Sequence, residues 1–233
     1  MIAAAKQLKV IGRHGVGVDN IDVKAATKKG IVVVYSPNAN ATSVAEHTLT
    51  AIGALAKRAV AYDRATREGR WEIRNSYKAV DLDGKTLGLV GIGRIGSMVA
   101  RRVAAAYNMK VIAFDPYVTP ETRGFVNEAK LRLMKPTAFL INFSRGEVVN
   151  EKPLFEGLRE NIIAAAAIDV YDPEPPLKEN PLFALENILL SPHSAALTEE
   201  CVIRMATGAA EGVVDVLSGR RPQFVVNPEV FEP

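Results

Sequence analysis

The sequence predicts an α/β protein with a parallel sheet, and three observations support this prediction. Apolar strand-like runs alternate with helical patterns along most of the 233 residues, which is typical of parallel sheets. A glycine motif runs from Gly91 to Gly96, between one apolar run and a helical pattern. Asp115 ends the next apolar run, 19 residues after Gly96. This combination is typical of a strand, turn and helix that bind a dinucleotide.

Each glycine of the motif Gly91-Ile92-Gly93-Arg94-Ile95-Gly96 has its own task. Gly91 permits a tight turn, Gly93 lets the backbone approach a pyrophosphate, and Gly96 lets the helix pack closely on the strand. The N–H groups at the helix start then bind the anion. Asp115 has the spacing of a carboxylate that binds the ribose hydroxyls, and it would repel a 2′-phosphate, so the sequence favours NAD over NADP. An ordinary glycine turn is the alternative, and the flanking strand, helix and acid argue against it.

The other elements follow from periodicity and from turn and capping residues. Short apolar runs predict strands at residues 8–11, 31–35, 86–90, 111–114, 138–142, 163–170 and 188–190. The run at residues 86–90 has no polar alternation and is expected to be buried on both faces, and the run at residues 111–114 is expected to be the next buried strand. Helical spacing predicts helices at residues 21–29, 42–68, 95–106, 127–134, 151–159 and 198–217, with Ser43 and Thr198 as N-caps. Residues 71–83 are expected to be an irregular crossover.

The composition is that of a globular protein, with 48% hydrophobic and 24% charged residues. The net charge of +3 is small and its basic residues are dispersed, which argues against nucleic acid as a partner. A single cysteine, Cys201, excludes an intrachain disulfide and favours a reducing compartment. No apolar run approaches the roughly 20 residues that span a bilayer, so we expect a cytoplasmic protein without membrane contact.

Six motifs occur in a fixed order: GRHGVGVDNIDVKAATKKGI, SPNANATSVAEHT, KTLGLVGIGRIG, INFSRGEVVNE, AAIDVYDPEPP and SPHSAAL. In this order they resemble the D-isomer-specific 2-hydroxyacid dehydrogenases, the group that includes phosphoglycerate dehydrogenase. The resemblance implies a Rossmann-type doubly wound parallel sheet in residues 81–195. It also implies a second, discontinuous substrate domain, flavodoxin-like but truncated, made of residues 1–80 and 196–233.

The resemblance further implies an NAD-dependent enzyme that interconverts a D-2-hydroxy acid and its 2-keto acid. His193 would be the general acid and base, and imidazole suits proton transfer near neutral pH. Glu174 would be its carboxylate partner, which fixes the tautomer and favours the imidazolium. Arg145 would bind the carboxylate and keto oxygen of the substrate through its forked donors.

The same resemblance implies the binding residues and the assembly. The substrate carboxylate would meet the backbone of Gly15, Val16 and Gly17, with Asn40 close by. The cofactor would contact Arg94, Ile95, Phe143 and Ser144, with Asp169 orienting the nicotinamide amide. No metal is expected, and the long helix at residues 42–68 would take part in a homodimer.

The chain departs from the family pattern in two places. Only seven residues, MIAAAKQ, precede the first expected strand, where the family has several dozen. In addition, Asp115 is almost adjacent to the segment TPETRG at Thr119, from which the family separates it by a helix and a central strand. Either the sequence omits segments of a longer polypeptide, or the polypeptide itself is shortened; the intact mass distinguishes them. A non-catalytic NAD-sensing corepressor and an inactive truncated homologue therefore stay as alternative functions.

Overall fold

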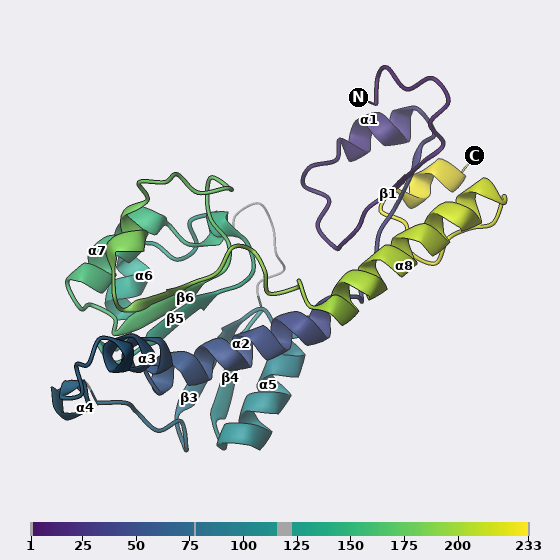
Figure 1. Ribbon diagram of the computed structural model, residues 1–233. Coiled ribbons are helices and arrows are strands. Elements are labelled where there is room, and N and C mark those ends of the chain that lie inside the picture. The colour runs from purple at the N-terminus through teal and green to yellow at the C-terminus, as the bar shows by residue number, and fades with distance from the viewer. Residues whose placement is uncertain (1, 77, 116–122, 233) are drawn as a thin grey trace. The chain divides into compact units, whose positions relative to one another are not determined.

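The computed structural model describes residues 2–76, 78–115 and 123–232, and the chain forms two compact units. The smaller unit is discontinuous and consists of residues 1–43 and 196–233, whereas the larger unit consists of residues 44–195. Figure 1 shows both units, with the two chain termini in the smaller one. No helix among the described residues is both long and apolar enough to cross a membrane.

The smaller unit is built on two short parallel strands. β1 (Val10–Gly12) pairs with β2 (Val32–Val34), and α1 (Val23–Lys28) connects them. The chain returns to this unit as α8 (Glu199–Leu217), which packs on both strands, and ends in the short 3₁₀ helix η4 (Pro228–Phe231). The hydroxyl of Thr198 accepts a hydrogen bond from the Cys201 N–H, which confirms Thr198 as an N-cap.

The larger unit alternates strands and helices, as the sequence predicts. Its helices are α2 (Ala41–Ala56, in this unit from Val44 on), α3 (Ala59–Arg67), α4 (Ile73–Ser76), α5 (Arg94–Tyr107), α6 (Glu128–Leu133) and α7 (Glu151–Arg159), with 3₁₀ turns η2 (Gly146–Val148) and η3 (Pro181–Ala184). Its strands are β3 (Thr86–Val90), β4 (Lys110–Phe114), β5 (Phe139–Asn142), β6 (Ala165–Ile168) and β7 (Ile188–Leu190). Every strand pair is parallel, which agrees with the predicted α/β class.

These five strands form two separate sheets among the described residues. β3 pairs with β4, and β5, β6 and β7 pair in that order, but no ladder joins the two sheets. One apolar core nevertheless receives side chains from both: Leu87 and Leu89 of β3 and Phe139 and Ile141 of β5 pack against the cluster formed with α2 and α5. The sheet is therefore interrupted between β3 and β5.

The strand β6 is buried on both faces, whereas β3 and β4, for which the sequence predicts burial, are not. Leu87 and Leu89 of β3 and Val111 of β4 face the core under α5, and the other residues of both strands are exposed. The expectation of buried strands is thus wrong for this pair, because Val90, Ile112 and Phe114 on the outer face stay more than half exposed, although the ring of Phe125 stacks on that of Phe114.

Two further expectations need correction. The helix predicted over residues 42–68 is two helices, because Arg58 adopts a left-handed conformation (φ 52°) between α2 and α3. The division into compact units falls between residues 43 and 44, because α2 packs with α5 through Ala45, Ile52 and Val99, and the domain boundary expected near residue 80 stays a prediction. Ser43 is no N-cap either: α2 already begins at Ala41, and the Ser43 hydroxyl contacts the hydroxyl of Thr198, 3.2 Å away.

Candidate active site

The glycine motif forms the turn that the sequence predicts. Gly91 has a positive φ of 92°, and its N–H donates to the carbonyl oxygen of Phe114 at the end of β4, over 2.7 Å. A Cβ atom on Gly96 would lie 2.3 Å from the Gly91 carbonyl oxygen, so only glycine permits this approach of helix to turn. The Asp115 carboxylate accepts a hydrogen bond from the Ile92 N–H (3.2 Å). The acid therefore lies at the turn, where a bound ribose would meet it.

The start of α5 completes this cradle. Helix α5 begins at Arg94, directly after Gly93, so its first N–H groups point toward the turn. Arg94 is exposed, whereas Ile95 packs against the core cluster under α5. Gly93 itself leaves open space where a Cβ would stand. The described residues thus fit the pyrophosphate and ribose of a dinucleotide.

His193 and Glu174 form a direct pair. Nδ1 of His193 lies 2.6 Å from Oε1 of Glu174, and both side chains keep roughly half of their surface exposed (48% and 40%). His193 has a left-handed backbone (φ 52°), which is rare for a residue with a side chain and turns the ring out of the loop. The contact assigns Nδ1 to the carboxylate and leaves Nε2 as the nitrogen that a substrate can reach.

Asp169 holds the loop that carries His193. It is almost fully buried, and its Oδ1 accepts from the Ser191 hydroxyl (2.6 Å) and the Ser194 N–H (2.8 Å). Its Oδ2 accepts from the Ala195 N–H (3.0 Å). The resemblance implies that Asp169 orients the nicotinamide amide, and that role stays a prediction. The contacts that are present make Asp169 the anchor of residues 191–195.

Sequence reasoning missed two further residues around this loop. The hydroxyl of Tyr171 donates to the Ser191 carbonyl oxygen (2.9 Å), and burial together with the nearby Asp169 raises the pKa of Tyr171, so the phenol stays a donor. Glu151 accepts from the Asp172 N–H (3.0 Å) and from Asn180 Nδ2 (2.7 Å), which fixes the loop that bears Glu174. Tyr171 lies inside the motif AAIDVYDPEPP and Glu151 is the last residue of the motif INFSRGEVVNE, so membership in these motifs is the signal that could have found them.

Arg145 follows β5 on an exposed turn. Its guanidinium donates to the Ser144 carbonyl oxygen (2.8 Å), and its own carbonyl oxygen accepts from Nδ2 of the buried Asn142 (2.8 Å). Asn142 Oδ1 accepts from both the N–H and the hydroxyl of Ser144. The ring of Phe143 lies 4.9 Å from the ring of His47, which makes His47 a packing residue. Asn142 therefore shapes the turn that presents Arg145.

The predicted site residues of the larger unit share a location. Each follows the carboxyl end of a strand: Gly91 follows β3, Asp115 follows β4, Arg145 follows β5, Asp169 follows β6 and His193 follows β7. In parallel α/β sheets this edge is where ligands bind. The structure brings His193 to Glu174 and Asp115 to the glycine turn by hydrogen bonds.

The predicted substrate residues Gly15, Val16, Gly17 and Asn40 lie in the smaller unit. Gly15 has φ 129°, and its carbonyl oxygen accepts from the Ser36 N–H. Arg13 donates from Nε to the Gly17 carbonyl oxygen (2.6 Å) and so closes the glycine loop. The side chain of Arg13 thus orders the glycine loop, and the role of this loop in substrate binding stays a prediction.

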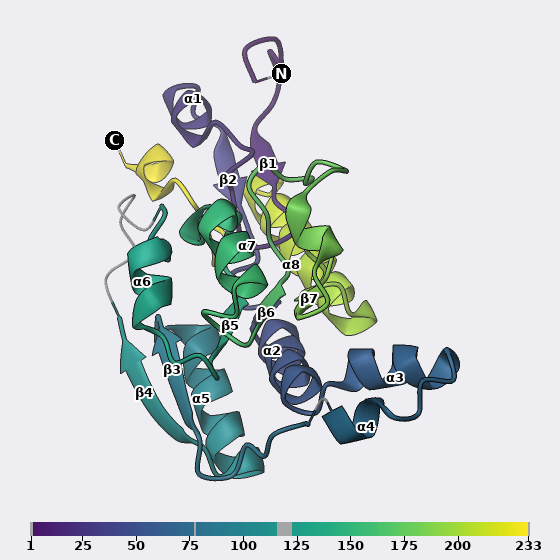
Figure 2. The same cartoon turned by 90° about the vertical axis from the view of Figure 1, so that its left-hand side faces the viewer.

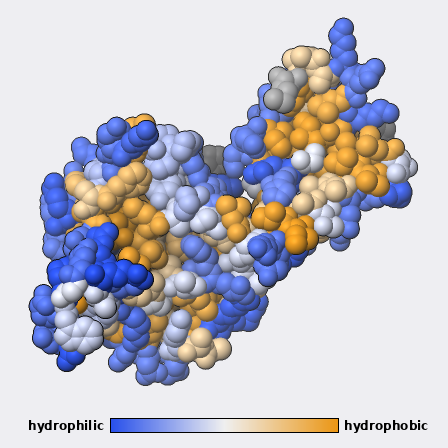
Figure 3. Space-filling view, in the orientation of Figure 1, coloured by the Kyte–Doolittle hydropathy of each residue, from blue (hydrophilic) through white to orange (hydrophobic). Residues whose placement is uncertain are grey.

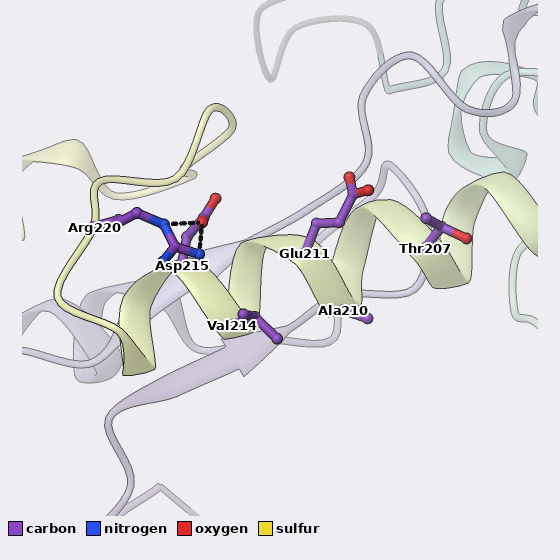
Figure 4. Close-up of a pocket in the computed structure, with 6 residues that line it drawn as sticks. All are labelled: Thr207, Ala210, Glu211, Val214, Asp215 and Arg220. Atoms are coloured by element: carbon purple, nitrogen blue, oxygen red, sulfur yellow. Dashed lines mark hydrogen bonds and ion pairs between the residues drawn. The ribbon is translucent and has the colours of Figure 1, made fainter.

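An open depression on α8 is lined by Thr207, Ala210, Glu211, Val214, Asp215 and Arg220, none of which is a predicted site residue (Figure 4). Arg220 pairs with Asp215 over 2.7 Å, so these two charges neutralise each other. The residues that line the depression therefore offer no convergent set of polar groups to a ligand. In the described part of the chain, no His, Cys, Asp or Glu residues cluster as metal ligands.

Comparison with known proteins identifies the family. The family model described as "D-isomer specific 2-hydroxyacid dehydrogenase, NAD binding domain" matches residues 49–120 and 117–195. The chain belongs to this family. Its fold is accordingly the Rossmann-type α/β fold, and the matched family model is that of an NAD-binding domain. The assignment of the glycine turn and Asp115 to the cofactor stays a prediction.

The relatives carry different names. A glyoxylate reductase of Korarchaeum cryptofilum is 38% identical over 98% of this chain and 79% of its own length. A D-3-phosphoglycerate dehydrogenase of Archaeoglobus fulgidus is 38% identical over all of this chain and 50% of its own. A solved structure, the TT0316 protein of Thermus thermophilus, matches with a TM-score of 0.89 and 37% identity over 95% of this chain and 80% of that one. The chain spans about half the length of the curated phosphoglycerate dehydrogenases that it matches.

The comparisons also support the internal departure from the family pattern. The alignment with the Archaeoglobus relative runs over 264 positions, although the chain has 233 residues, so at least 31 positions have no counterpart in this chain. The two family matches meet at residues 117–120, directly after β4 and Asp115. The break in the family match therefore falls where the sequence predicts a missing helix and strand.

Proposed function

We propose that this chain is an NAD-dependent oxidoreductase that interconverts a D-2-hydroxy acid and its 2-keto acid, with phosphoglycerate and glyoxylate-type acids as the first candidates. The observation that carries the proposal is the contact of His193 Nδ1 with Glu174 Oε1 at 2.6 Å. His193 follows the carboxyl end of β7, and the glycine turn likewise follows the carboxyl end of β3. An exposed imidazole oriented by a carboxylate is suited to a general base.

The proposed chemistry assigns one task to each side chain. Glu174 accepts a hydrogen bond from Nδ1–H of His193, so Nε2 is free to remove the hydroxyl proton of the substrate in oxidation and to return it in reduction. Arg145 binds the substrate carboxylate and holds C2 in place. Bound NAD supplies the hydride acceptor. Asp115 binds the ribose hydroxyls and excludes a 2′-phosphate by charge repulsion.

We infer that the smaller unit contributes to substrate binding through Gly15, Val16, Gly17 and Asn40. The glycine loop offers backbone N–H groups, which suit a carboxylate. Its order, maintained by Arg13, supports such a role because a preorganised loop costs less entropy on binding. The division of the chain into substrate and dinucleotide domains rests on this assignment.

We also infer a homodimer formed through the larger unit. A groove there is lined largely by apolar residues: Ala54, Leu55, Val60 and Ala61 of the α2–α3 region, and Phe139, Ala165, Ile188 and Leu189 of the sheet. Val60 is 56% exposed. Figure 3 shows apolar side chains gathered beside α3 on this unit. Exposed apolar area of this kind marks protein interfaces, and sedimentation velocity measures the assembly directly.

The test combines binding and turnover. NADH binding to the purified chain is measured by calorimetry, 2-keto acids are then added, and absorbance of the reduced nicotinamide is followed. His193→Ala is expected to lower kcat by about a hundredfold or more, with NADH affinity unchanged, because the residue acts on the proton alone. Glu174→Gln is expected to lower kcat less, by about tenfold to a hundredfold, because a neutral partner no longer stabilises the imidazolium.

Glu179→Gln is the control, since Glu179 is an exposed acid five residues from Glu174. Unchanged turnover in His193→Ala would contradict the assigned role. NADH binding without turnover of any keto acid would favour the sensor alternative, and loss of NADH binding would favour the inactive homologue.

A further inference from the structure

The two-stranded sheet of β3 and β4 presents an apolar face to solvent. In the ladder, Val90 lies opposite Phe114 and Gly88 opposite Ile112, so these residues share one face. The exposed fractions are 59% for Val90, 65% for Ile112 and 58% for Phe114. The opposite face packs under α5, and Figure 2 shows β4 at the border of the unit with α5 on one side. Parallel sheets are normally covered on both faces, so this exposure is anomalous.

The same strands also lack partners along their edges. Among the described residues, β3 pairs only with β4, and β5 pairs only with β6. Both β3 and β5 nevertheless send side chains into one core cluster. Unpaired N–H and C=O groups along a strand are a template for another strand. An open strand edge and an uncovered apolar face thus occur together on β3 and β4.

The comparison with relatives indicates what covers this region elsewhere in the family. At least 31 aligned positions have no counterpart here, and the break lies directly after β4. A strand needs only about five or six residues, and a parallel crossover needs about a dozen or more. The absent positions therefore suffice for one helix and one strand, which are the two elements that the open edge and the uncovered face lack.

We propose that this surface binds a helix-and-strand segment supplied by a different protein chain, not by a second copy of this one. The strand pairs with the free edge of β3, and the apolar side of the helix covers Val90, Ile112 and Phe114. Main-chain hydrogen bonds along the edge provide affinity, and the apolar face provides specificity for a segment with matching apolar side chains. The proposal concerns the surface alone and does not depend on catalytic activity.

The experiment uses a synthetic peptide with the sequence that the Archaeoglobus fulgidus phosphoglycerate dehydrogenase has at the break. The fluorescein-labelled peptide is titrated with the purified 233-residue chain, and anisotropy gives the Kd. We expect saturable binding and no binding of a scrambled peptide of the same composition. Ile112→Lys is expected to weaken binding by about tenfold or more, because it places a charge under the helix.

Ile203→Lys is the matched control. Ile203 lies on α8 of the smaller unit and is 64% exposed, so the same substitution at equal exposure tests whether the effect belongs to the β3–β4 face. It should change the Kd by less than about twofold. Circular dichroism melts of both variants verify that the fold is retained, as expected for exposed positions.

Three results would overturn the proposal: no saturable binding, equal binding of the scrambled peptide, or equal weakening by the two variants. A fourth is a second copy as the occupant. In that case Ile112→Lys would dissociate a dimer in sedimentation velocity without any peptide present. NADH binding is measured separately, so failure of the proposed function and failure of this proposal are distinguishable.

Discussion

At the residue scale, we attribute the choice between NAD and NADP to Asp115. Its carboxylate lies at the glycine turn and accepts from the Ile92 N–H, so a phosphate on the adenosine ribose would meet a negative charge there. The charge is exposed, which moderates the repulsion through solvent and salt. The Asp115 charge therefore discriminates most strongly between NAD and NADP at low ionic strength.

Asp115→Ala is expected to reduce the preference for NADH over NADPH by about tenfold, mainly by improving NADPH binding. Calorimetric Kd values for both cofactors at low salt give this ratio. Asp83→Ala, which removes another exposed acid of the larger unit, should leave it unchanged. A ratio that is the same in Asp115→Ala and in the parent chain would remove the basis for the NAD preference.

Among the elements, η2 packs closely against another backbone segment. A Cβ atom on Gly146 would lie 1.9 Å from the Tyr171 carbonyl oxygen and 2.8 Å from the Asp172 nitrogen. Two backbone segments therefore touch, one following Arg145 and the other preceding Glu174. Because neither can yield without moving the strand end behind it, this contact fixes the spacing of two predicted site residues.

Gly146→Ala is expected to destabilise the larger unit by about 2–3 kcal/mol or more, since the clash is with backbone. Gly157→Ala is the matched control: its Cβ would meet only the side chains of Leu131, at 3.7 Å, and Ile162, at 4.0 Å, and α7 should gain up to about 1 kcal/mol. Urea unfolding followed by circular dichroism compares the two. Equal effects would mean that the close approach does not matter for stability.

Tyr171, in the loop after β6, makes the free energy of unfolding fall as the pH becomes alkaline. The pKa of Tyr171 is raised above its usual 10.0, chiefly by burial and then by Asp169. The unfolded chain therefore releases this proton before the folded chain does, and the contribution of Tyr171 is complete below about pH 10 and is lost as pH rises through the folded pKa. Tyr171→Phe should flatten the fall of the urea midpoint above about pH 10.

At neutral pH the same variant should cost about 0.5–1.5 kcal/mol through the lost bond to the Ser191 carbonyl oxygen. Tyr62→Phe, on α3, serves as the control and should retain the alkaline slope of the parent chain. An unaltered slope in Tyr171→Phe would assign the alkaline transition to other groups.

Local signals were sufficient for most elements and for the NAD turn. The glycine motif, the span of α7 and the Thr198 cap follow from residues close in sequence. Two structural features that the sequence analysis did not predict have causes in residues that are distant in sequence or absent. Arg58 sits among good helix formers, and only its contacts explain the break, including the bond from its Nε to the Lys78 carbonyl oxygen. The exposed face of β3 and β4 depends on an element that the chain lacks, which no pattern within these strands can reveal.

At the scale of the whole molecule, the stability of the smaller unit depends on contacts between its N-terminal segment around β2 and its C-terminal segment around Asn227. Asn227 is fully buried, and its Oδ1 accepts from the Val33 N–H (2.8 Å). Its Nδ2 donates to the Ile31 carbonyl oxygen (2.9 Å) and to the Thr27 hydroxyl (3.0 Å). One amide thereby satisfies backbone groups of the segment around β2 from 194 residues away. The two-stranded sheet is too small for independent stability, so these long-range bonds matter more than usual.

Asn227→Ala is expected to destabilise the smaller unit by about 2 kcal/mol or more, because a buried N–H and a buried carbonyl lose their partner. Hydrogen exchange, read by mass spectrometry on peptides that cover residues 8–35, should accelerate strongly, while peptides from β5 and β6 in the larger unit should not change. Asn75→Ala, at an exposed position, should leave both sets as they are. Equal acceleration in both sets would mean that the two units unfold as one, and no acceleration would mean that packing of α8 alone maintains the sheet.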